Sequence, residues 1–251
     1  MNILPQPPKT ASPAVHGDCR IADLSQNRIL AVLPTDELAA LQPHFSRIAL
    51  PVYAMLRKGN ARMTSLYFPA SGMVSCVVGM EDGLTVEVGI VGREGMVEVS
   101  ALLGYGKSAG ASSFVQVKGE AFAIGSEHIE QVFTGNHGLL PSILRRYISA
   151  QWGLLARGAA CNRLHTSEQR FSRWLLMTMD RVGADFAMTH EFLGQMLGSR
   201  RATVTVEAQK LQAAGILRYN HGKMYILKRK GLEDTACECY RLQDLDDFLK
   251  P

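Results

Sequence analysis

Residues 188–227 decide the fold, and they read MTHEFLGQMLGSRRATVTVEAQKLQAAGILRYNHGKMYIL. Thr189 is a suitable N-cap, because its hydroxyl can accept a hydrogen bond from a free backbone N–H of the first turn. The apolar residues that follow share one helical face, and they are Phe192, Leu193, Met196 and Leu197. The spacing therefore predicts a short amphipathic helix.

A glycine turn and a second helix follow. Gly198 can adopt the left-handed conformation that ends a helix without steric strain, and Ser199 is the expected N-cap of the next helix. Inside that helix the residues spaced for burial are Val204, Ala208 and Leu211. Gly215 ends the helix. Two strands, 216–219 and 224–227, are then expected across the turn 220–222.

This order of elements predicts a winged helix-turn-helix that reads duplex DNA. The outward face of the second helix opens with Arg200 and Arg201, and Arg can bond guanine O6 and N7 in a bidentate manner. Arg201 is the first candidate for base readout, and Thr203 is the candidate for a phosphate contact. The predicted DNA-contacting residues are Ser199, Arg200, Arg201, Thr203, Thr205, Gln209, His190 in the first helix and Lys223 beside the wing. The alternative is an ordinary helical subdomain with a solvated Arg pair.

Charge is concentrated around the same segment. Residues 162–230 hold 12 Lys/Arg and 5 Asp/Glu, a net of +7, whereas the whole chain carries +4. A basic segment in an otherwise slightly acidic chain is typical of a module that contacts phosphates.

Composition sets the wider limits. A chain of 251 residues with 47% hydrophobic residues accommodates one large or two modest globular domains. No apolar run approaches 18 residues and no signal peptide precedes the chain, so a cytoplasmic protein without a membrane partner is expected. The five scattered cysteines give no disulfide framework.

The N-terminal half contains two kinds of sequence pattern. Residues 27–41 look helical, with a break at Pro34, whereas residues 48–124 consist of short β-branched runs between glycine-rich turns. The expected strands are 67–68, 73–78, 85–91 and 114–117. Such spacing predicts a β-sandwich, jelly roll or barrel, a fold that often encloses a small ligand without proving one.

A long helix is expected at 136–162. Its apolar residues follow a 4-3 spacing that predicts pairing with a second copy of the helix, and the predicted dimerisation residues are Leu140, Leu144, Tyr147, Gln151 and Leu154. Ile143, Ile148 and Leu155 form a second apolar stripe that suits packing on the β domain. A core helix without dimerisation is therefore the alternative.

These elements give an α+β fold: an N-terminal β domain of the sandwich, jelly-roll or barrel type, a long dimerisation helix and a C-terminal winged helix-turn-helix. The predicted boundaries are a flexible tail at 1–22, the β-roll at 23–135, the helix at 136–162 and the DNA-binding domain at 163–251. The predicted partners are double-stranded DNA and a second copy of the chain, with a small-molecule effector in the β-roll left open.

The same order of domains resembles that of the Crp–Fnr family of bacterial transcription regulators, from about Asn27 to Tyr240. The most specific matches are LGQMLG at 193–198, Arg201-x-Thr203-Val204, LQAAGI at 211–216 and YFPASG at 67–72. CNRLH at 161–165, EQR at 168–170, WLL at 174–176 and CECY at 237–240 resemble a proteobacterial branch with no fixed effector. The resemblance implies that the N-terminal domain is a cyclic-nucleotide-binding-like β-roll (jelly roll). It also implies a homodimeric transcription regulator, without catalytic activity, on a two-fold symmetric operator.

The departures from the family pattern concern operator and effector. Ala202 and Val206 stand where the best-known members carry a Glu and an Arg that read DNA, so a different operator is expected. The cyclic-nucleotide segments read EVS at 98–100 and Ala-Ser at 111–112, without the Arg that pairs with the phosphate. A buried phosphate would lack its guanidinium partner, so weak or no cyclic-nucleotide binding is predicted. With Cys19 alone before Cys76, an N-terminal iron–sulfur cluster lacks its thiolates.

Two alternatives come from other classes of protein. ALLGYGKS at 101–108 fits a relaxed phosphate loop of an NTP-binding protein, and residues 106–110 match a hydrolase nucleophile elbow by spacing. Both motifs need a helix directly afterwards, whereas residues 114–117 look like a strand. The other alternative is a β-roll that senses a ligand without binding DNA.

No cofactor and no metal ligand are assigned from the sequence. Cys237 and Cys239 form a Cys-x-Cys pair, which is half of a structural zinc site. The preferred interpretation is two ordinary cysteines on a terminal helix or turn, and His165 is interpreted as an ordinary surface residue.

Overall fold

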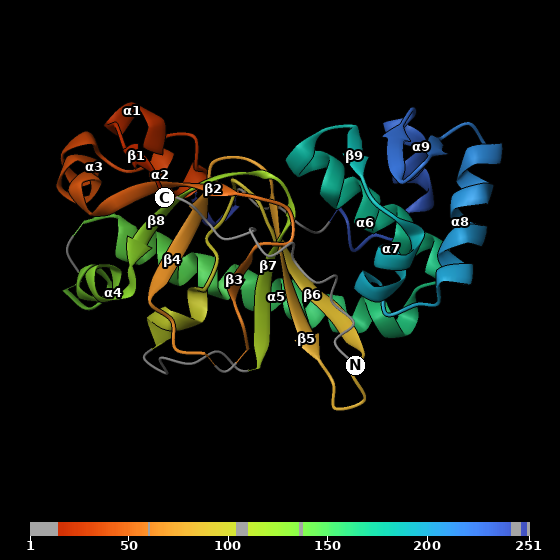
Figure 1. Ribbon diagram of the computed structural model, residues 1–251, viewed down its shortest axis with the longest axis horizontal. Coiled ribbons are helices and arrows are strands. Elements are labelled where there is room, and N and C mark those ends of the chain that lie inside the picture. The colour runs from red at the N-terminus through yellow and green to blue at the C-terminus, as the bar shows by residue number, and fades with distance from the viewer. Residues whose placement is uncertain (1–14, 60, 104–109, 136–137, 242–246, 250–251) are drawn as a thin grey trace.

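The computed structural model describes residues 15–59, 61–103, 110–135, 138–241 and 247–249. Figure 1 shows two lobes joined by a long helix, with the β-sheets in the first lobe and a mainly helical unit in the second. The predicted α+β architecture is confirmed. Among the described residues, no helix is both long and apolar enough to cross a membrane.

The first lobe is a β-roll of two antiparallel four-stranded sheets. One sheet has the order β1-β2-β8-β4, formed by Val15–Asp18, Phe45–Leu50, Gly119–Gly125 and Ser65–Pro69. The other has the order β3-β7-β5-β6, formed by Met55–Arg57, Ala111–Val117, Met73–Gly79 and Thr85–Val91. The four predicted strands are confirmed, and β1, β2, β3 and β8 were not predicted.

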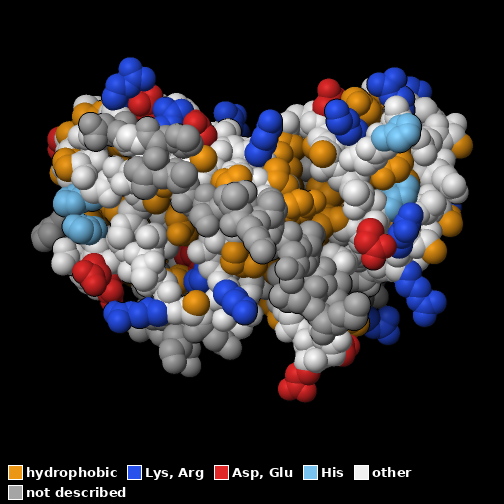
Figure 2. Space-filling model, in the orientation of Figure 1, with side chains coloured by type: hydrophobic (Ala, Val, Ile, Leu, Met, Phe, Trp, Pro, Cys, Tyr) orange, Lys and Arg blue, Asp and Glu red, His pale blue; other side chains and the backbone are white. Residues whose placement is uncertain are grey.

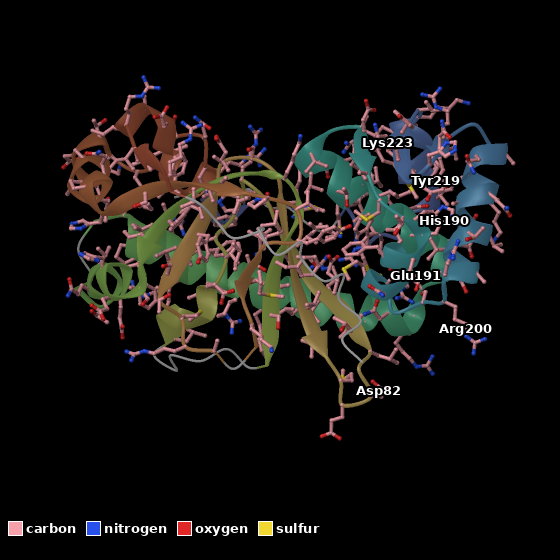
Figure 3. All side chains as sticks on the ribbon, viewed as in Figure 1. Asp82, His190, Glu191, Arg200, Tyr219 and Lys223 are labelled. Atoms are coloured by element: carbon pink, nitrogen blue, oxygen red, sulfur yellow. The ribbon has the colours of Figure 1, made fainter. Side chains whose placement is uncertain are left out.

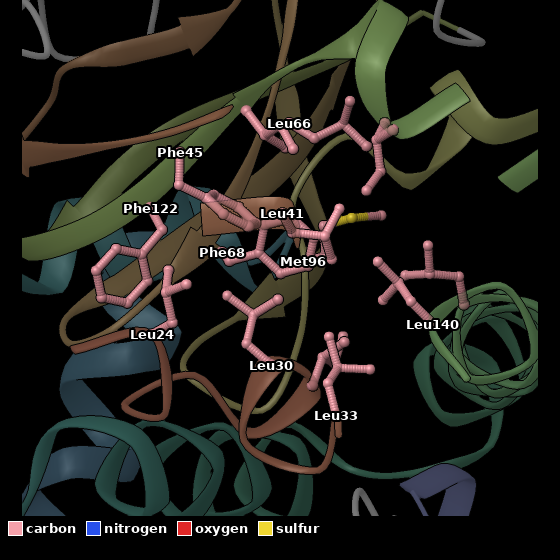
Figure 4. Packing of buried hydrophobic residues seen from close by; sticks show 14 of the residues in the cluster. Leu24, Leu30, Leu33, Leu41, Phe45, Leu66, Phe68, Met96, Phe122 and Leu140 are labelled. Carbon is pink, nitrogen blue, oxygen red and sulfur yellow. The ribbon is translucent and has the colours of Figure 1, made fainter. Parts of the chain in front are cut away.

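Short helices close one end of the β-roll. They are α1 (Ile21–Leu24), α2 (Arg28–Ala31), α3 (Thr35–Leu41), η1 (Gln42–His44), η2 (Val99–Leu103) and α4 (Ser126–Gly135). The predicted break at Pro34 is confirmed, because this residue is the N-cap of α3. Helices and sheet share one core, in which Leu30, Phe68 and Phe122 are fully buried (Figure 4).

The predicted tail at 1–22 extends too far. Its described part contains β1 and the start of α1, and β1 pairs with β2 through Val15↔Ile48 and Asp18↔Ser46. Cys19 directly after β1 is buried in the core. The Pro-rich composition that suggested a tail ends at Pro13, before these residues. The sequence gives no local sign that the next residues form an edge strand.

The linking helix is α5 (Leu140–Leu164). Its N-terminus is capped by a residue far away in the sequence. The Glu37 carboxylate accepts hydrogen bonds from the N–H groups of Leu139 and Leu140 at 2.8 and 2.9 Å. At its rise of about 1.5 Å per residue, a helix of 25 residues is about 37 Å long and reaches from one lobe to the other (Figure 1).

The second lobe is the winged unit. It contains α6 (Ser167–Val182), β9 (Asp185–Ala187), α7 (His190–Met196), α8 (Arg201–Ala213), β10 (Leu217–Asn220), β11 (Lys223–Ile226) and α9 (Arg229–Thr235). The wing is a three-stranded sheet of order β10-β11-β9, so β9 adds a strand to the predicted hairpin.

The chain end returns to the first lobe. The short helix η3 (Asp247–Leu249) packs on α5, and Phe248 is buried with its ring centroid 5.1 Å from that of Tyr147. The last described residues therefore belong to the core of the β-roll, not to the predicted domain at 163–251. An aromatic residue in an acidic stretch gives no local sign of which core it joins.

The lobes also meet directly. Phe192 of α7 packs edge-on against Tyr53 and Phe114 of the β-roll, with ring centroids 6.3 and 6.0 Å apart. Arg181 of α6 forms a buried ion pair with Glu94, its Nη2 lying 2.7 Å from the carboxylate. The outer face of the second sheet is thus covered by the winged unit, which fixes how α8 is presented.

Candidate nucleic-acid interface

The turn between α7 and α8 has the predicted chemistry. The Thr189 hydroxyl accepts a hydrogen bond from Phe192 N–H at 3.2 Å, which confirms the cap, and Gly198 has the expected positive φ of 58°. Gly194 was not singled out. A Cβ at that position would lie 2.8 Å from the Ser199 carbonyl oxygen, so only glycine allows the two helices to approach this closely.

The second helix begins one residue later than predicted. Arg200 is its N-cap and makes no side-chain cap, whereas the Ser199 hydroxyl donates back to the Leu197 carbonyl oxygen at 3.4 Å. The predicted capping role of Ser199 is therefore wrong, because Gly198 turns the chain so that the serine belongs to the turn. The first N–H groups of α8 lack a side-chain acceptor from the N-cap, which suits an anion.

The predicted inward and outward faces of α8 are confirmed. Val204, Ala208 and Leu211 are buried in the second-lobe core. The outward candidates Arg200, Arg201 and Gln209 are exposed, and Thr203 is half-buried above Glu207. Val206 of the same helix is also exposed, at 49%.

Two of the predicted contact residues are occupied with each other. His190 Nδ1 lies 3.0 Å from the Thr205 hydroxyl, and its ring stacks on Tyr219 at a centroid distance of 4.0 Å. Burial and the nearby Arg201 charge lower the pKa of His190, which keeps the ring neutral at physiological pH. These residues position α8 against the wing (Figure 3).

The wing turns through His221 and Gly222, which both have positive φ, at 47° and 77°. Two central residues with positive φ are typical of the two-residue hairpin turn that matches strand twist. Lys223 directly after the turn is exposed, as is Arg218 on the neighbouring strand, whose guanidinium lies 4.5 Å from the centre of the Tyr225 ring. Basic side chains therefore extend from α8 onto the wing.

Not all of the basic residues are available to DNA. Arg181 pairs with Glu94, and Arg229 pairs with Asp180, so both are engaged within the chain. Among the described residues, no ion pair involves Arg200 or Arg201. On the face shown in Figure 2, Lys and Arg side chains lie on both lobes, including the edge of the second lobe. The start of α8 and the wing thus present exposed basic side chains.

Comparison with protein families gives the class of this unit. Residues 169–235 match the family model described as a Crp-like helix-turn-helix domain. The winged unit is a Crp-like helix-turn-helix domain. The matched residues run from the first turn of α6 to the last residue of α9, so the Crp-like domain includes both helices of the motif and the wing.

Solved structures extend the likeness beyond the Crp-like domain. A protein described as a Crp/Fnr-family transcriptional regulator from Eubacterium rectale is 16% identical, with a TM-score of 0.67 over 86% of this chain and 99% of that one. FixK2 from Bradyrhizobium japonicum is 15% identical, with a TM-score of 0.63 over 77% and 98%.

The c-di-GMP-responsive regulator CLP from Xanthomonas campestris is 18% identical, with a TM-score of 0.62 over 77% of this chain and 99% of that one. No curated protein matches the sequence. At these identities the likeness establishes a shared fold, and together with the Crp-like domain it confirms the predicted Crp–Fnr resemblance.

The predicted dimerisation residues fall into two groups along α5. Leu140, Leu144 and Tyr147 are buried within their own chain against the β-roll, so they are not available to a partner in this conformation. Gln151 and Leu154 are half-buried beside a cleft of about 230 Å³ between α5, β6 and α6. Leu155 also lines this cleft and is 44% exposed, and Trp152 is 75% exposed.

The described part of the β-roll interior, where an effector would bind, contains a buried ion pair. Arg57 and Glu98 are buried within the β-roll, where they pair directly, and Glu98 also accepts from the Ser113 hydroxyl. Arg57 donates in addition to the Ala111 carbonyl oxygen at 2.7 Å. The guanidinium inside the roll is therefore already engaged by a carboxylate.

The phosphate-loop alternative falls largely on residues 104–109, which lie outside the described residues. The segment that follows is the strand β7, and Asp180, the downstream Asp that such a loop would need at the end of a strand, lies in the helix α6. Neither element supplies the helix N-terminus that a phosphate loop or a nucleophile elbow requires.

The Cys-x-Cys pair lies in a cluster that the sequence did not predict. Cys161 and His165 at the end of α5 meet Cys237 and Cys239 after α9, and their four ligand atoms lie within 4.8 Å of one another. All three cysteines are buried. The signal that could have found the cluster is the four-residue spacing of Cys161 and His165, which puts both on one face of a helix.

Proposed function

We propose that this protein is a sequence-specific transcription regulator that binds duplex DNA as a homodimer on a two-fold symmetric operator. The observation that carries the proposal is the exposed, uncapped N-terminal turn of α8, where Arg200 and Arg201 stand beside the basic wing in a Crp-like domain. This arrangement suits entry of α8 into the major groove, with the wing on the backbone. The proposal assigns no catalytic step.

Within this proposal Arg201 reads a base. It lies at the first position of α8 with an exposed side chain, and a guanidinium there can bond guanine O6 and N7. Val206, which is also exposed on α8, suits an apolar contact with a thymine methyl group. Thr203, Gln209 and Lys223 supply polar and charged contacts, with Thr203 placed for a phosphate.

The second half of α5 provides the dimer contact. Trp152 and Leu155 are three residues apart and exposed, so they share a face that nothing covers within the described chain. An exposed Trp beside an exposed Leu is typical of an interaction surface. A pair of such helices would hold two copies of α8 apart by a fixed distance, as a symmetric operator requires.

Our proposal excludes cyclic AMP as the effector of this regulator. The charge of the buried Arg57 is neutralised by Glu98, and a cyclic phosphate that took the place of Glu98 on this guanidinium would displace that carboxylate. Such a displacement would leave Glu98 buried without its partner, which is unfavourable.

Selection from a random pool of duplex DNA at physiological salt tests the proposal. The expected result is an inverted repeat with half-sites about 10 bp apart, centre to centre. Arg201→Ala should weaken binding by roughly 1–3 kcal/mol and relax the preference at one base pair of each half-site. Arg62→Ala is the matched control, because it removes one exposed positive charge from the first lobe.

A uniform loss across all sequences would place Arg201 on phosphate. Recovery of no specific sequence, with or without added cell extract, would overturn the regulator and favour a β-roll that senses a ligand without binding DNA.

A further inference from the structure

The cluster at the root of the Crp-like domain has the chemistry of a metal site. We propose that Cys161, His165, Cys237 and Cys239 bind one structural Zn²⁺ ion. Three sulfurs and one imidazole nitrogen form the Cys₃His set that Zn²⁺ takes in closed, four-coordinate sites. With four protein ligands no position is left for water or substrate, so the ion has a structural role.

The observed distances are close to those of a tetrahedral site. With Zn–S bonds of about 2.3 Å and a Zn–N bond of about 2.0 Å, ligand atoms in a tetrahedral site lie about 3.5–3.8 Å apart. Cys161 Sγ lies 3.6 Å from Cys237 Sγ, and Cys239 Sγ lies 3.6 Å from His165 Nδ1. The widest separation within the set is at most 4.8 Å, so it closes by a side-chain movement of about 1 Å.

The imidazole is already oriented for the ion. His165 Nε2 lies 3.2 Å from a Glu238 carboxylate oxygen, which accepts a hydrogen bond from the Nε2–H group and leaves the Nδ1 lone pair facing the sulfurs. Metal-binding histidines almost always donate their second N–H to a carboxylate, a carbonyl or water. Glu238 therefore acts as a positioning residue between the two cysteines that flank it in sequence.

The fold holds the two halves of the site together without help from the cluster. Tyr240, next to Cys239, donates its hydroxyl to Asp180 at 2.7 Å, and Arg229 donates to the other oxygen of that carboxylate at 2.7 Å. These bonds attach the segment after α9 to α6. The ligands are thus brought together before the ion arrives.

The surroundings compensate the charge of a loaded site. Three thiolates and a neutral imidazole around Zn²⁺ carry a net charge of about −1. Arg170 of α6 interacts electrostatically with Cys161 and Cys237, and Arg173 interacts with Cys239. Positively charged side chains beside a buried anionic site lower the free energy of the zinc-bound form.

Two other uses of the cluster explain fewer of these observations. A Cys161–Cys237 disulfide would leave Cys239, His165 and the Glu238 contact without a role. An iron–sulfur cluster is held by four thiolates, whereas three sulfurs and a nitrogen converge here.

Metal content tests the proposal directly. Protein purified without chelator and dialysed against metal-free buffer should carry one zinc per chain by plasma mass spectrometry. Cys239→Ser and His165→Ala should lower that content at least tenfold. Cys76→Ser is the matched control, because it removes a free cysteine of β5 outside the cluster and should leave the zinc in place.

Two further measurements test the proposal even if a variant that lacks a zinc-ligating side chain fails to fold. Glu238→Gln retains all four ligands and should weaken Zn²⁺ affinity about 10–100-fold in competition with a chelating dye. Co²⁺ added to the reduced apoprotein should give the intense visible bands of a tetrahedral ion together with thiolate charge transfer.

The proposal is overturned if reduced wild-type protein takes up neither Zn²⁺ nor Co²⁺. It is also overturned if mass spectrometry of protein purified without reductant shows a Cys161–Cys237 disulfide in place of the metal. Neither outcome depends on whether the protein binds DNA.

Discussion

The hydroxyl of Tyr147 lies 3.0 Å from both the backbone nitrogen and the carbonyl oxygen of Met96, donating to the oxygen and accepting from the N–H. Tyr147 belongs to α5, and Met96 belongs to the segment of the β-roll that leads into Glu98. A Cβ on Gly95 would lie only 2.4 Å from the Tyr147 hydroxyl oxygen, so the Tyr147 side chain occupies the space that a larger residue at position 95 would need. One side chain therefore couples the linking helix to the candidate effector region.

Tyr147→Phe should destabilise the first lobe. The change leaves the buried N–H and carbonyl of Met96 without their partner, a loss of about 1–3 kcal/mol in the free energy of unfolding. Urea unfolding followed by circular dichroism measures the effect. Tyr225→Phe, which removes a hydroxyl on the wing, is the control and should change stability by less. Equal stability of Tyr147→Phe and wild type would show that water replaces the two hydrogen bonds.

Gly194→Ala should disrupt the helix-turn-helix. The added methyl group would lie 2.8 Å from the Ser199 carbonyl oxygen, so α7 and α8 must separate. Overpacking of this kind costs about 1–3 kcal/mol, and it should also abolish selection of the specific operator. Gly153→Ala in α5 meets nothing within 4 Å and should instead stabilise its helix slightly. Wild-type operator binding by Gly194→Ala would contradict the close approach.

Contact between the lobes should depend on pH through Glu87. Its carboxylate in β6 accepts from Trp174 Nε1 of α6 at 2.7 Å, and burial raises its pKa to about 7, against the weaker opposing effects of Ser75, Trp174, Arg181 and Arg173. Because the folded state holds the proton more tightly than the unfolded state, this contribution is complete below about pH 4.5 and is lost as the pH rises towards 7.

Comparison with Glu87→Gln isolates this effect, since the amide does not titrate. Between pH 4.5 and 7 the free energy of unfolding of wild type should fall relative to the variant, by on the order of 1–3 kcal/mol. Urea titrations at several pH values measure the difference. Parallel curves for the two proteins would mean that Glu87 keeps an ordinary pKa.

Trp152→Glu should convert the proposed dimer to a monomer. A charge in the exposed apolar face of α5 would have to be buried without a partner on association. Sedimentation velocity at micromolar concentration should show the change, and DNA binding should lose its two-fold symmetry. Val32→Glu is the control, because Val32 is an exposed apolar residue of the first lobe. A variant that stays dimeric would place the interface elsewhere.

Short-range signals predicted the Crp-like domain well. The Thr189 cap, the positive φ of Gly198 and the burial of Val204 and Leu211 depend on neighbours within a few residues, which a sequence displays directly. Ser199 failed as a cap because the turn geometry around it took precedence over its intrinsic preference. Local chemistry thus predicted the elements and missed a boundary.

Long-range contacts explain most of what the sequence did not predict. The 4-3 spacing of Leu140, Leu144 and Tyr147 is real, but an apolar stripe does not indicate whether its partner is another chain or the β-roll. Cys161 and His165 are separated from Cys237 and Cys239 by more than 70 residues, and the two pairs meet only because α6 and α9 pack together. Half of that cluster, read alone, resembled an ordinary cysteine pair.

The return of Phe248 to Tyr147 has a practical consequence for anyone who labels this protein. A fluorophore or fusion partner placed after Leu249 would emerge beside the β-roll, away from the surface proposed to meet DNA. Such a label would report on events near α5 and Met96. A probe for movement of the recognition helix would have to be attached within the wing itself, for example at the exposed His221.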